Sequence, residues 1–186
     1  KAGCNLVKLG IETGSRAILE ETDKGVTFDQ IRNAARMLNR QNLFWSGYFM
    51  IGLPMETEED ILQTHGFMKE LNPYYAALGV YNPFPNTTLF DRGVELGLLR
   101  KEVDLSHFFN THPKDYYFVD PRRRVLHIEN ERYLEIVDWM MGKFHQHNKK
   151  ISNLMRRGWS RRRAYAHDCR LLFGDVRKAI RWIGVK

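Results

Sequence analysis

Three apolar runs, each closed by small, polar or proline residues and each followed by a helical pattern, constrain the fold of this chain most strongly. They end in residues 9–15, 49–57 and 81–87. An alternation of strand and helix predicts parallel strands, whose carboxyl ends lie at one edge of a sheet. In α/β barrels the ligands bind at that edge, because the loops that leave the strands converge there. We therefore expect the three segments to form one site.

The helices between these strands carry recognisable start signals. Strands are predicted over residues 6–11, 43–53 and 76–81. Thr27 and Gln30 have the spacing of a capping box, which predicts the start of a helix with one buried face. Three acidic residues follow Thr57, where the helix dipole favours them, and predict a second helix that ends at Asn72. A third, short helix is predicted over residues 88–99.

The pattern changes after Lys101. A long loop with a short hairpin is predicted up to Ile128, then one amphipathic helix from Glu129 to about Met155, and two short helices over residues 161–173 and 175–184. The predicted organisation is residues 1–104 as the α/β part, 105–128 as a connector and 129–186 as a helical extension. The predicted fold class is α/β, a partial TIM-like barrel with three parallel strands and flanking helices.

Charge is also distributed unevenly along the chain. Its 186 residues carry a net charge of +7, but residues 1–121 carry −4 and residues 122–186 carry +11. The densest basic run is residues 156–163, with Trp159 inside it. This run is typical either of a surface that holds nucleic acid by charge and stacking, or of a solvated face whose aliphatic stems cover apolar surface.

Several kinds of site are not indicated. Cys4 and Cys169 are the two cysteines, too far apart in sequence for a disulfide framework or a metal site, and we expect both to be buried or incidental thiols. His145 and His147 are two residues apart on a predicted helix and face different sides. No nucleophile elbow, Walker loop or GxGxxG segment is present. We predict no metal ligand and no catalytic residue in this chain.

The compartment and the extent of the chain are inferred from composition. The chain is 43% apolar and has no signal or transmembrane segment in its sequence, so we expect a cytoplasmic protein with no membrane partner. Its first residue is lysine and a strand-like run follows almost at once. We therefore expect a piece of a longer protein.

Three short segments resemble radical S-adenosylmethionine (SAM) enzymes. Residues 10–15 read GIETGS and are similar to a GIESGS segment common in cobalamin-associated members of that superfamily. Residues 50–57, MIGLPMET, resemble MIGLPGET, and residues 83–87, PFPNT, resemble PFPGT. The three occur in the family's order, and the resemblance covers residues 1–99.

The resemblance implies the C-terminal half of a radical SAM (β/α)₆ core. Such enzymes hold a [4Fe–4S] cluster on a CxxxCxxC loop and cleave SAM reductively to a 5′-deoxyadenosyl radical, or use SAM for methyl transfer. Some members also bind cobalamin. This chain has no CxxxCxxC segment. The implied partner is the N-terminal half of the barrel, without which the chain is expected to be inactive and, through its open sheet edges, to self-associate. The substrate and the reaction type are not indicated.

The resemblance also implies which residues bind SAM. Glu12 would accept hydrogen bonds from the ribose hydroxyls, the second segment would lie against the adenine, with Gly52 allowing a close approach of the base, and the third would add contacts to the adenine. The implied set is Glu12, Thr13, Ser15, Met50, Ile51, Gly52, Leu53, Pro54, Asn82, Phe84 and Pro85.

Alternatives remain at this point. Glu12 could instead cap the next helix or pair with a lysine, and Glu56 is expected to fix its loop rather than touch a substrate. Asn86 replaces a glycine but tolerates left-handed backbone. The competing function is a non-catalytic α/β module whose basic tail binds nucleic acid.

Overall fold

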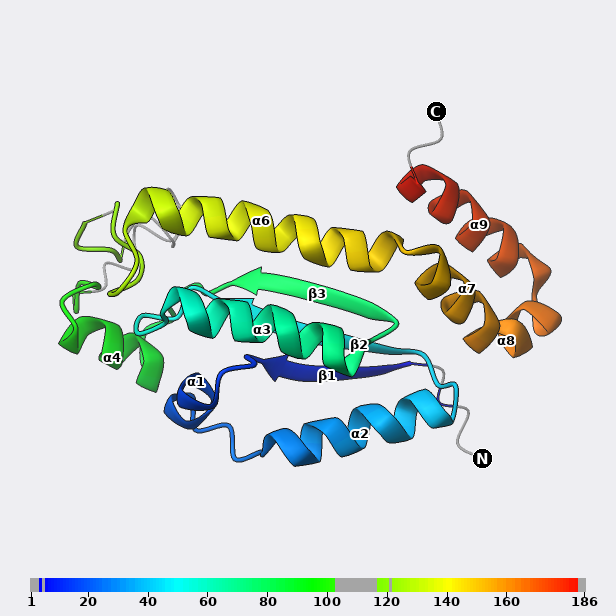
Figure 1. Cartoon of the computed structure of the whole chain (residues 1–186), viewed down its shortest axis with the longest axis horizontal. Helices are drawn as coiled ribbons and strands as arrows, with labels where there is room; N and C mark the ends of the chain where they lie inside the picture. Colours follow the sequence, from blue (N-terminus) through cyan, green and yellow to red (C-terminus); the bar gives the residue numbers. More distant parts are fainter. Residues whose placement is uncertain (1–3, 5, 103–116, 121, 184–186) are drawn as a thin grey trace.

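A parallel three-stranded sheet forms the centre of the molecule, in the order β1-β2-β3. The computed structural model describes residues 4, 6–102, 117–120 and 122–183. The strands are β1 (Val7–Glu12), β2 (Trp45–Ile51) and β3 (Tyr75–Val80); both pairs are parallel, and the arrowheads of β1 and β3 in Figure 1 point the same way. The predicted fold class, α/β with a partial barrel of three parallel strands, is confirmed.

One face of the sheet is covered by helices. Helices α1 (Arg16–Glu21) and α2 (Phe28–Arg40) connect β1 to β2, and α3 (Glu58–Leu71) connects β2 to β3. In Figure 1, α3 lies between α2 and the long helix α6 (Asn130–Lys149). Side chains of α2, α3 and α6 form the main core with alternate residues of β2, namely Trp45, Phe49 and Ile51. The rings of Phe49 and Phe144 meet edge to face at 5.3 Å.

The opposite face of the sheet is more open. Strand β2 alternates, so that Tyr48 is exposed between the buried Gly47 and Phe49. Lys8 on β1 and Gly79 on β3 are exposed as well. Because successive side chains of a strand point to opposite faces, these residues mark the face that α2, α3 and α6 do not cover.

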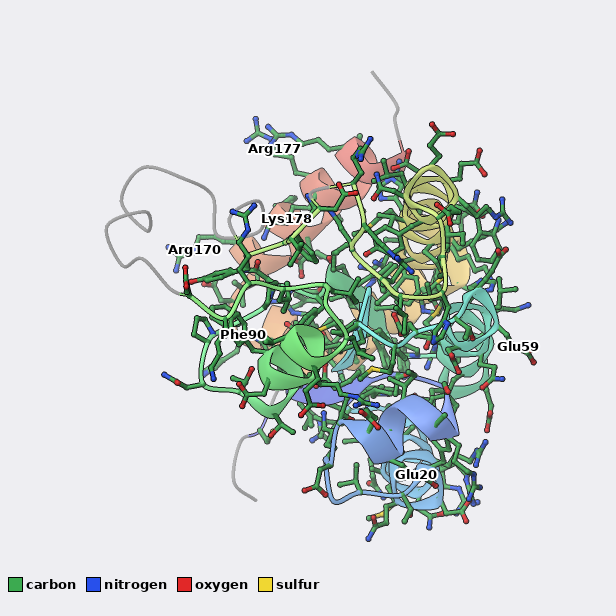
Figure 2. The ribbon with its side chains drawn as sticks, turned by 90° about the vertical axis from the view of Figure 1, so that its left-hand side faces the viewer. Glu20, Glu59, Phe90, Arg170, Arg177 and Lys178 are labelled. Carbon is green, nitrogen blue, oxygen red and sulfur yellow. The ribbon has the colours of Figure 1, made fainter. Side chains whose placement is uncertain are left out.

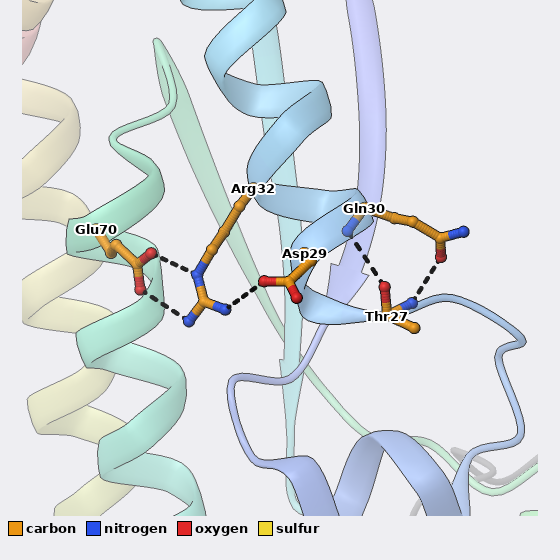
Figure 3. Close-up of polar contacts among 5 residues, drawn as sticks. All are labelled: Thr27, Asp29, Gln30, Arg32 and Glu70. Atoms are coloured by element: carbon orange, nitrogen blue, oxygen red, sulfur yellow. Dashed lines mark hydrogen bonds and ion pairs between the residues drawn. The ribbon is translucent and has the colours of Figure 1, made fainter.

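The capping box predicted for α2 is confirmed (Figure 3). Thr27 Oγ1 accepts a hydrogen bond from Gln30 N at 3.2 Å, and Gln30 Oε1 accepts one from Thr27 N at 2.8 Å. Figure 3 also shows Arg32 between two carboxylates: its Nε lies 2.6 Å from Glu70 on α3, and its Nη1 lies 3.4 Å from Asp29. This surface ion pair joins α2 to α3.

The connector differs from the predicted hairpin. After α4 (Thr88–Glu95), Phe118 forms an antiparallel bridge with Leu99, and Leu126 N donates to Pro54 O at 2.8 Å. Within residues 117–120 and 122–128, no strand pairing between the two predicted arms is present. The remainder of the predicted connector, residues 105–116 and 121, lies outside the described residues.

The predicted helix from Glu129 to Met155 is two helices. Helix α6 ends at Lys149, Lys150 has a non-helical ψ of 130°, and α7 (Ile151–Ser160) follows. The break is stabilised by Asn153, whose Nδ2 donates to His147 O in the last turn of α6, 2.7 Å away, while Lys150 N donates to Gln146 O at 3.1 Å. Nearby, the side-chain amide of Asn148 pairs with the backbone of Ala76 on β3. Its Oδ1 accepts from Ala76 N at 2.8 Å, and its Nδ2 donates to Ala76 O at 2.7 Å.

The last two helices are also divided differently from the prediction. They are α8 (Arg162–His167) and α9 (Cys169–Ile183), so the break falls at Asp168 and not at Gly174. Asp168 Oδ1 accepts from Arg170 N at 3.0 Å, which is the bond of an N-cap. Helices α7, α8 and α9 lie at the end of the molecule opposite the arrowheads of the strands (Figure 1).

Two further findings concern the thiols and the helices. Cys4 and Cys169 are free and exposed, so of the two expected possibilities, buried or incidental thiols, burial does not apply. None of the helices in the described ranges combines the length and the apolar character that crossing a bilayer requires.

Candidate functional site

The carboxyl ends of the three strands bring the predicted segments to one edge of the sheet. Glu12 pairs with Phe49 in the ladder and Ile51 with Val80, and Tyr81 N extends the second ladder by donating to Ile51 O at 2.7 Å. Figure 2 views the molecule from this end, with α1 and α4 nearest the viewer. We call Glu12, Gly52 and Asn82, which lie at or directly after the strand ends, the carboxyl rim.

Glu12 is paired with a lysine. Its Oε1 lies 2.6 Å from Lys24 Nζ, which also donates to Gly10 O at 2.6 Å. The ladder is irregular between Gly10 and Glu12, and Glu12 has a φ of +67°. Both charged side chains are about a quarter exposed, and no described residue donates to the second carboxylate oxygen, Oε2. The lysine pair expected as an alternative is therefore present, and it leaves one acceptor for a ligand.

Thr13 and Ser15 are buried and fasten the first rim loop to α3. Thr13 Oγ1 lies 3.2 Å from Thr64 Oγ1, which accepts from Gly14 N at 2.9 Å. Ser15 Oγ donates to Asp60 Oδ1 at 2.5 Å. Burial acts to raise the pKa of Asp60, but the hydrogen bonds from Ser15 and Thr57 outweigh it and hold that pKa below its usual value. In this arrangement the two hydroxyls position the loop, and a role in binding SAM stays a prediction.

Glu56 fixes the second rim loop, as expected. Its side chain is fully buried, and Oε2 accepts from Gly52 N at 2.5 Å and from Leu53 N at 3.0 Å. Burial raises the pKa of Glu56 to about 8, although the two N–H donors act to lower it. Its other oxygen, Oε1, is buried and has no hydrogen-bond partner among the described residues. Burial therefore outweighs the two donors at this carboxyl group.

Gly52 makes room for a tyrosine. It has a φ of +87°, and a Cβ added to it would overlap the hydroxyl oxygen of Tyr133, at the start of α6. Burial and the nearby Glu56 raise the pKa of Tyr133 well above its usual range. The absent side chain at Gly52 therefore leaves room for the Tyr133 hydroxyl, and a close approach of the adenine at Gly52 stays a prediction.

The other residues of the second segment are mostly enclosed. Ile51 and Leu53 are fully buried, Ile51 in the main core and Leu53 in a smaller cluster with Ile18 and Tyr81. Pro54 is buried as well. Met50 is half-buried and alternates with core residues, so it is the side chain of this segment that faces the more open side of the sheet.

The third segment offers an unsatisfied acceptor. Asn82 Oδ1 is buried and receives no hydrogen bond from any described residue. Phe84 is 59% exposed and Pro85 is half-buried. Asn86 has a φ of +64°, which confirms that it takes left-handed backbone in place of glycine.

Sequence reasoning missed two residues of this edge. Neither Lys24 nor Tyr133 was singled out, although Tyr133 falls within the amphipathic helix predicted from Glu129 to about Met155. Tyr133 reaches Gly52 across a long stretch of chain, and no local pattern indicates such a contact. Across the described ranges, no group of three or more His, Cys, Asp or Glu is placed to hold a metal ion.

The basic run is largely engaged within the molecule. Arg156 lies over the ring of Tyr74 at 4.3 Å and donates to Asn72 O at 3.2 Å and Asn39 Oδ1 at 3.0 Å. Arg161 lies 2.5 Å from Asp175. These contacts favour the structural interpretation of the run over a nucleic-acid surface.

Comparisons with known proteins agree with the three segments. Residues 1–68 match the family model of the Radical SAM superfamily. The chain is similar to an uncharacterized methyltransferase of Pyrococcus horikoshii, with 30% identity over 74% of this chain and 28% of the relative. It is 26% identical to the anaerobic magnesium-protoporphyrin IX monomethyl ester cyclase of Cereibacter sphaeroides, over 91% of this chain and 26% of the relative.

A further similarity covers a shorter part of the chain. The tRNA-2-methylthio-N(6)-dimethylallyladenosine synthase of Treponema pallidum is 32% identical over 47% of this chain and 20% of the relative. The chain spans about a quarter of the length of the Pyrococcus horikoshii and Cereibacter sphaeroides relatives. All three relatives carry enzyme names.

Proposed function

We propose that this chain, which is part of a radical SAM domain, supplies the ribose and adenine side of the SAM site of a radical SAM enzyme. The proposal rests on the carboxyl rim, where the three family-like segments meet at one edge of a parallel sheet. Ligands of such folds bind at this edge.

The buried oxygen of Asn82 is the single observation that carries the proposal. A buried acceptor without a donor costs about 1–3 kcal/mol, so it favours a ligand that brings a donor. The adenine amino group and the ribose hydroxyls are such donors. Glu12 Oε2 is a second acceptor at the same rim, and Met50 is an apolar side chain on the more open face. These features fit an adenosine group.

Most of the other residues implied by the resemblance would shape the SAM site through the backbone. Thr13 and Ser15 hold the first loop against α3, and Glu56 holds the amides of Gly52 and Leu53. Ile51 and Pro54 are enclosed, so any contact to SAM there would come from main-chain atoms. Phe84 and Pro85 would add apolar contact from the third loop.

In the parent enzyme, a [4Fe–4S] cluster would supply the electron for reductive cleavage of SAM, or SAM would be used for methyl transfer. This chain contains no CxxxCxxC segment, so the cluster ligands would come from outside its 186 residues. We propose that the chain by itself is inactive and associates through its open strand edges. Cobalamin, which the resemblance alone supports, and the cytoplasmic location expected from the sequence belong to the same proposal.

Binding of S-adenosylhomocysteine to the chain tests the proposal. At millimolar ligand we expect amide shifts in NMR spectra confined to residues 10–15, 50–55 and 81–86. Asn82→Ala should weaken binding about fivefold, because one buried hydrogen bond contributes about 1 kcal/mol. Asn33→Ala, an exposed asparagine on α2, should leave binding unchanged. Shifts at the other end of the sheet, or equal affinity in Asn82→Ala, would contradict the proposal.

A further inference from the structure

A cavity lies at the amino end of the sheet, away from the carboxyl rim. It has a volume of about 360 Å³ and lies between the starts of β2 and β3 and helices α7, α8 and α9. Phe44 precedes the first residue of β2, and Tyr75 is the first residue of β3. Pockets that hold small molecules begin at about this size.

The walls of this cavity are mainly apolar. Phe44 and Leu154 contribute from the sheet side and α7, and Leu172 and Val176 contribute from α9. Leu172 and Val176 are 41% and 46% exposed, which is high for aliphatic side chains of a helix that packs on its neighbours. An apolar ligand body would cover this surface and remove it from water.

The polar part of the lining is positively charged. Arg157, Arg161 and Lys178 line the cavity, against a single carboxylate, Asp175. That carboxylate already accepts hydrogen bonds from Arg161 Nη1 at 2.5 Å and from Tyr165 Oη at 2.7 Å. Its charge is therefore compensated inside the protein, and the lining retains an excess of positive charge.

Arg157 is the most enclosed of these basic groups. Its guanidinium donates to the carbonyl oxygens of Asn148 and Asn153, and burial lowers its pKa. A buried cation is stabilised by a nearby anion, since the attraction is strong where water is scarce. Asp175 already attracts this guanidinium, and an anion in the cavity would add to that attraction.

We propose that this cavity binds an amphipathic monoanion, with an apolar body against Phe44, Leu154 and Val176 and an acidic head group beside Arg157 and Lys178. The binding site is separate from the carboxyl rim, because it lies at the opposite ends of the strands. Aliphatic and aromatic acids share the required chemistry.

Calorimetric titration of the chain with decanoate and with 2-naphthoate tests the proposal. The acid that binds more tightly shows whether the cavity prefers an aliphatic or an aromatic ligand body. We expect one saturable site for at least one acid, and much weaker binding of decanol, which lacks the charge. Absence of binding by both acids, or equal binding of decanol, would overturn the proposal.

Two glycines provide a matched pair of variants for the cavity. Gly158 on α7 lines the cavity, and a Cβ added there meets no atom within 4 Å, so Gly158→Leu should fill the space without a clash. Gly66 on α3 has equally free surroundings but lies elsewhere. Gly158→Leu should abolish binding and Gly66→Leu should preserve it. Equal affinities in the two variants would overturn the proposal.

Two neighbouring cations on α9 test the head group without touching the core. Figure 2 labels Arg177 and Lys178, both exposed, of which only Lys178 lines the cavity. Lys178→Gln should weaken binding of the acid roughly two- to fivefold, as expected for one exposed charge pair, and Arg177→Gln should not. The same loss in both variants would indicate attraction by overall charge and would overturn the proposed site.

Discussion

The hydroxyl group of Tyr133 lies where a side chain at Gly52 would begin. This contact connects the first turns of α6 to the second loop of the carboxyl rim. Glu56 belongs to the same unit, because it holds the amide of Gly52 and acts on the pKa of Tyr133. The rim loop is therefore shaped by a helix that comes much later in the chain.

Gly52→Ala is expected to destabilise the protein for two reasons. A φ of +87° costs an L-residue about 1–2 kcal/mol, and the new Cβ overlaps the Tyr133 hydroxyl. Tyr133→Phe removes that oxygen, so Gly52→Ala should cost less when it is combined with Tyr133→Phe. Urea denaturation of the parent, the two single variants and the double variant measures this difference.

Gly25→Ala is the control for this cycle. Gly25 has a φ of +67° and no atom within 4 Å of an added Cβ, so it reports the backbone cost alone. If Gly52→Ala costs no more than Gly25→Ala, or is purely additive with Tyr133→Phe, the steric contact does not stabilise the fold.

Glu56 should make the free energy of unfolding depend on pH. Burial raises its pKa from an ordinary 4.5 to about 8 in the folded state. Its contribution is therefore fully present below pH 4.5 and is lost as pH rises through about 8, since the unfolded chain releases the proton earlier. Each pKa unit corresponds to about 1.4 kcal/mol.

Glu56→Gln should remove this pH dependence, because the amide does not titrate. Urea denaturation between pH 5 and about 8.5 should show a falling stability in the parent protein and a flatter profile in the variant. Glu59→Gln changes an exposed acid in the first turn of α3 and should keep the parent slope. An unchanged slope in Glu56→Gln would assign the effect to another group.

Thr64→Val should loosen the first rim loop. The hydroxyl of Thr64 accepts from Gly14 N and contacts Thr13, and valine preserves the shape while removing both contacts. Loss of the acceptor leaves polar groups unpaired, at a cost of about 1–3 kcal/mol by thermal or urea denaturation. Thr88→Val, at an exposed position, should change stability by less than about 0.5 kcal/mol.

Arg156→Ala should destabilise the protein by about 1–2 kcal/mol, because the guanidinium both covers Tyr74 and binds two oxygens of other elements. Arg163→Ala removes the same charge from an exposed position of the same run and should have little effect. Equal stability of the two variants would show that the run contributes only surface charge.

Much of the fold was predictable because its signals are local. The capping box at Thr27, the acidic first turn after Thr57 and the apolar runs specify helices and strands within a few residues. Asn86 was also correctly expected to tolerate left-handed backbone, since asparagine accepts positive φ better than most residues.

The errors occurred where a distant or competing contact decides the structure. The helix after Glu129 ends early because Asn153 satisfies its last turn, and Asp168 starts a helix that continues through Gly174. At the rim, the contact between Tyr133 and Gly52 depends on the packing of α6, which no periodicity describes. The binding roles of the rim residues stay predictions.

The amide of Asn148 has a consequence for how other chains can join this sheet. Tyr81 donates to β2, so the backbone groups of Ala76, Leu78 and Val80 point to the outer side of β3. Asn148 already occupies both groups of Ala76, like a short stretch of neighbouring strand. An added strand can therefore pair with β3 only from Leu78 onward. This restriction sets the register of the added strand.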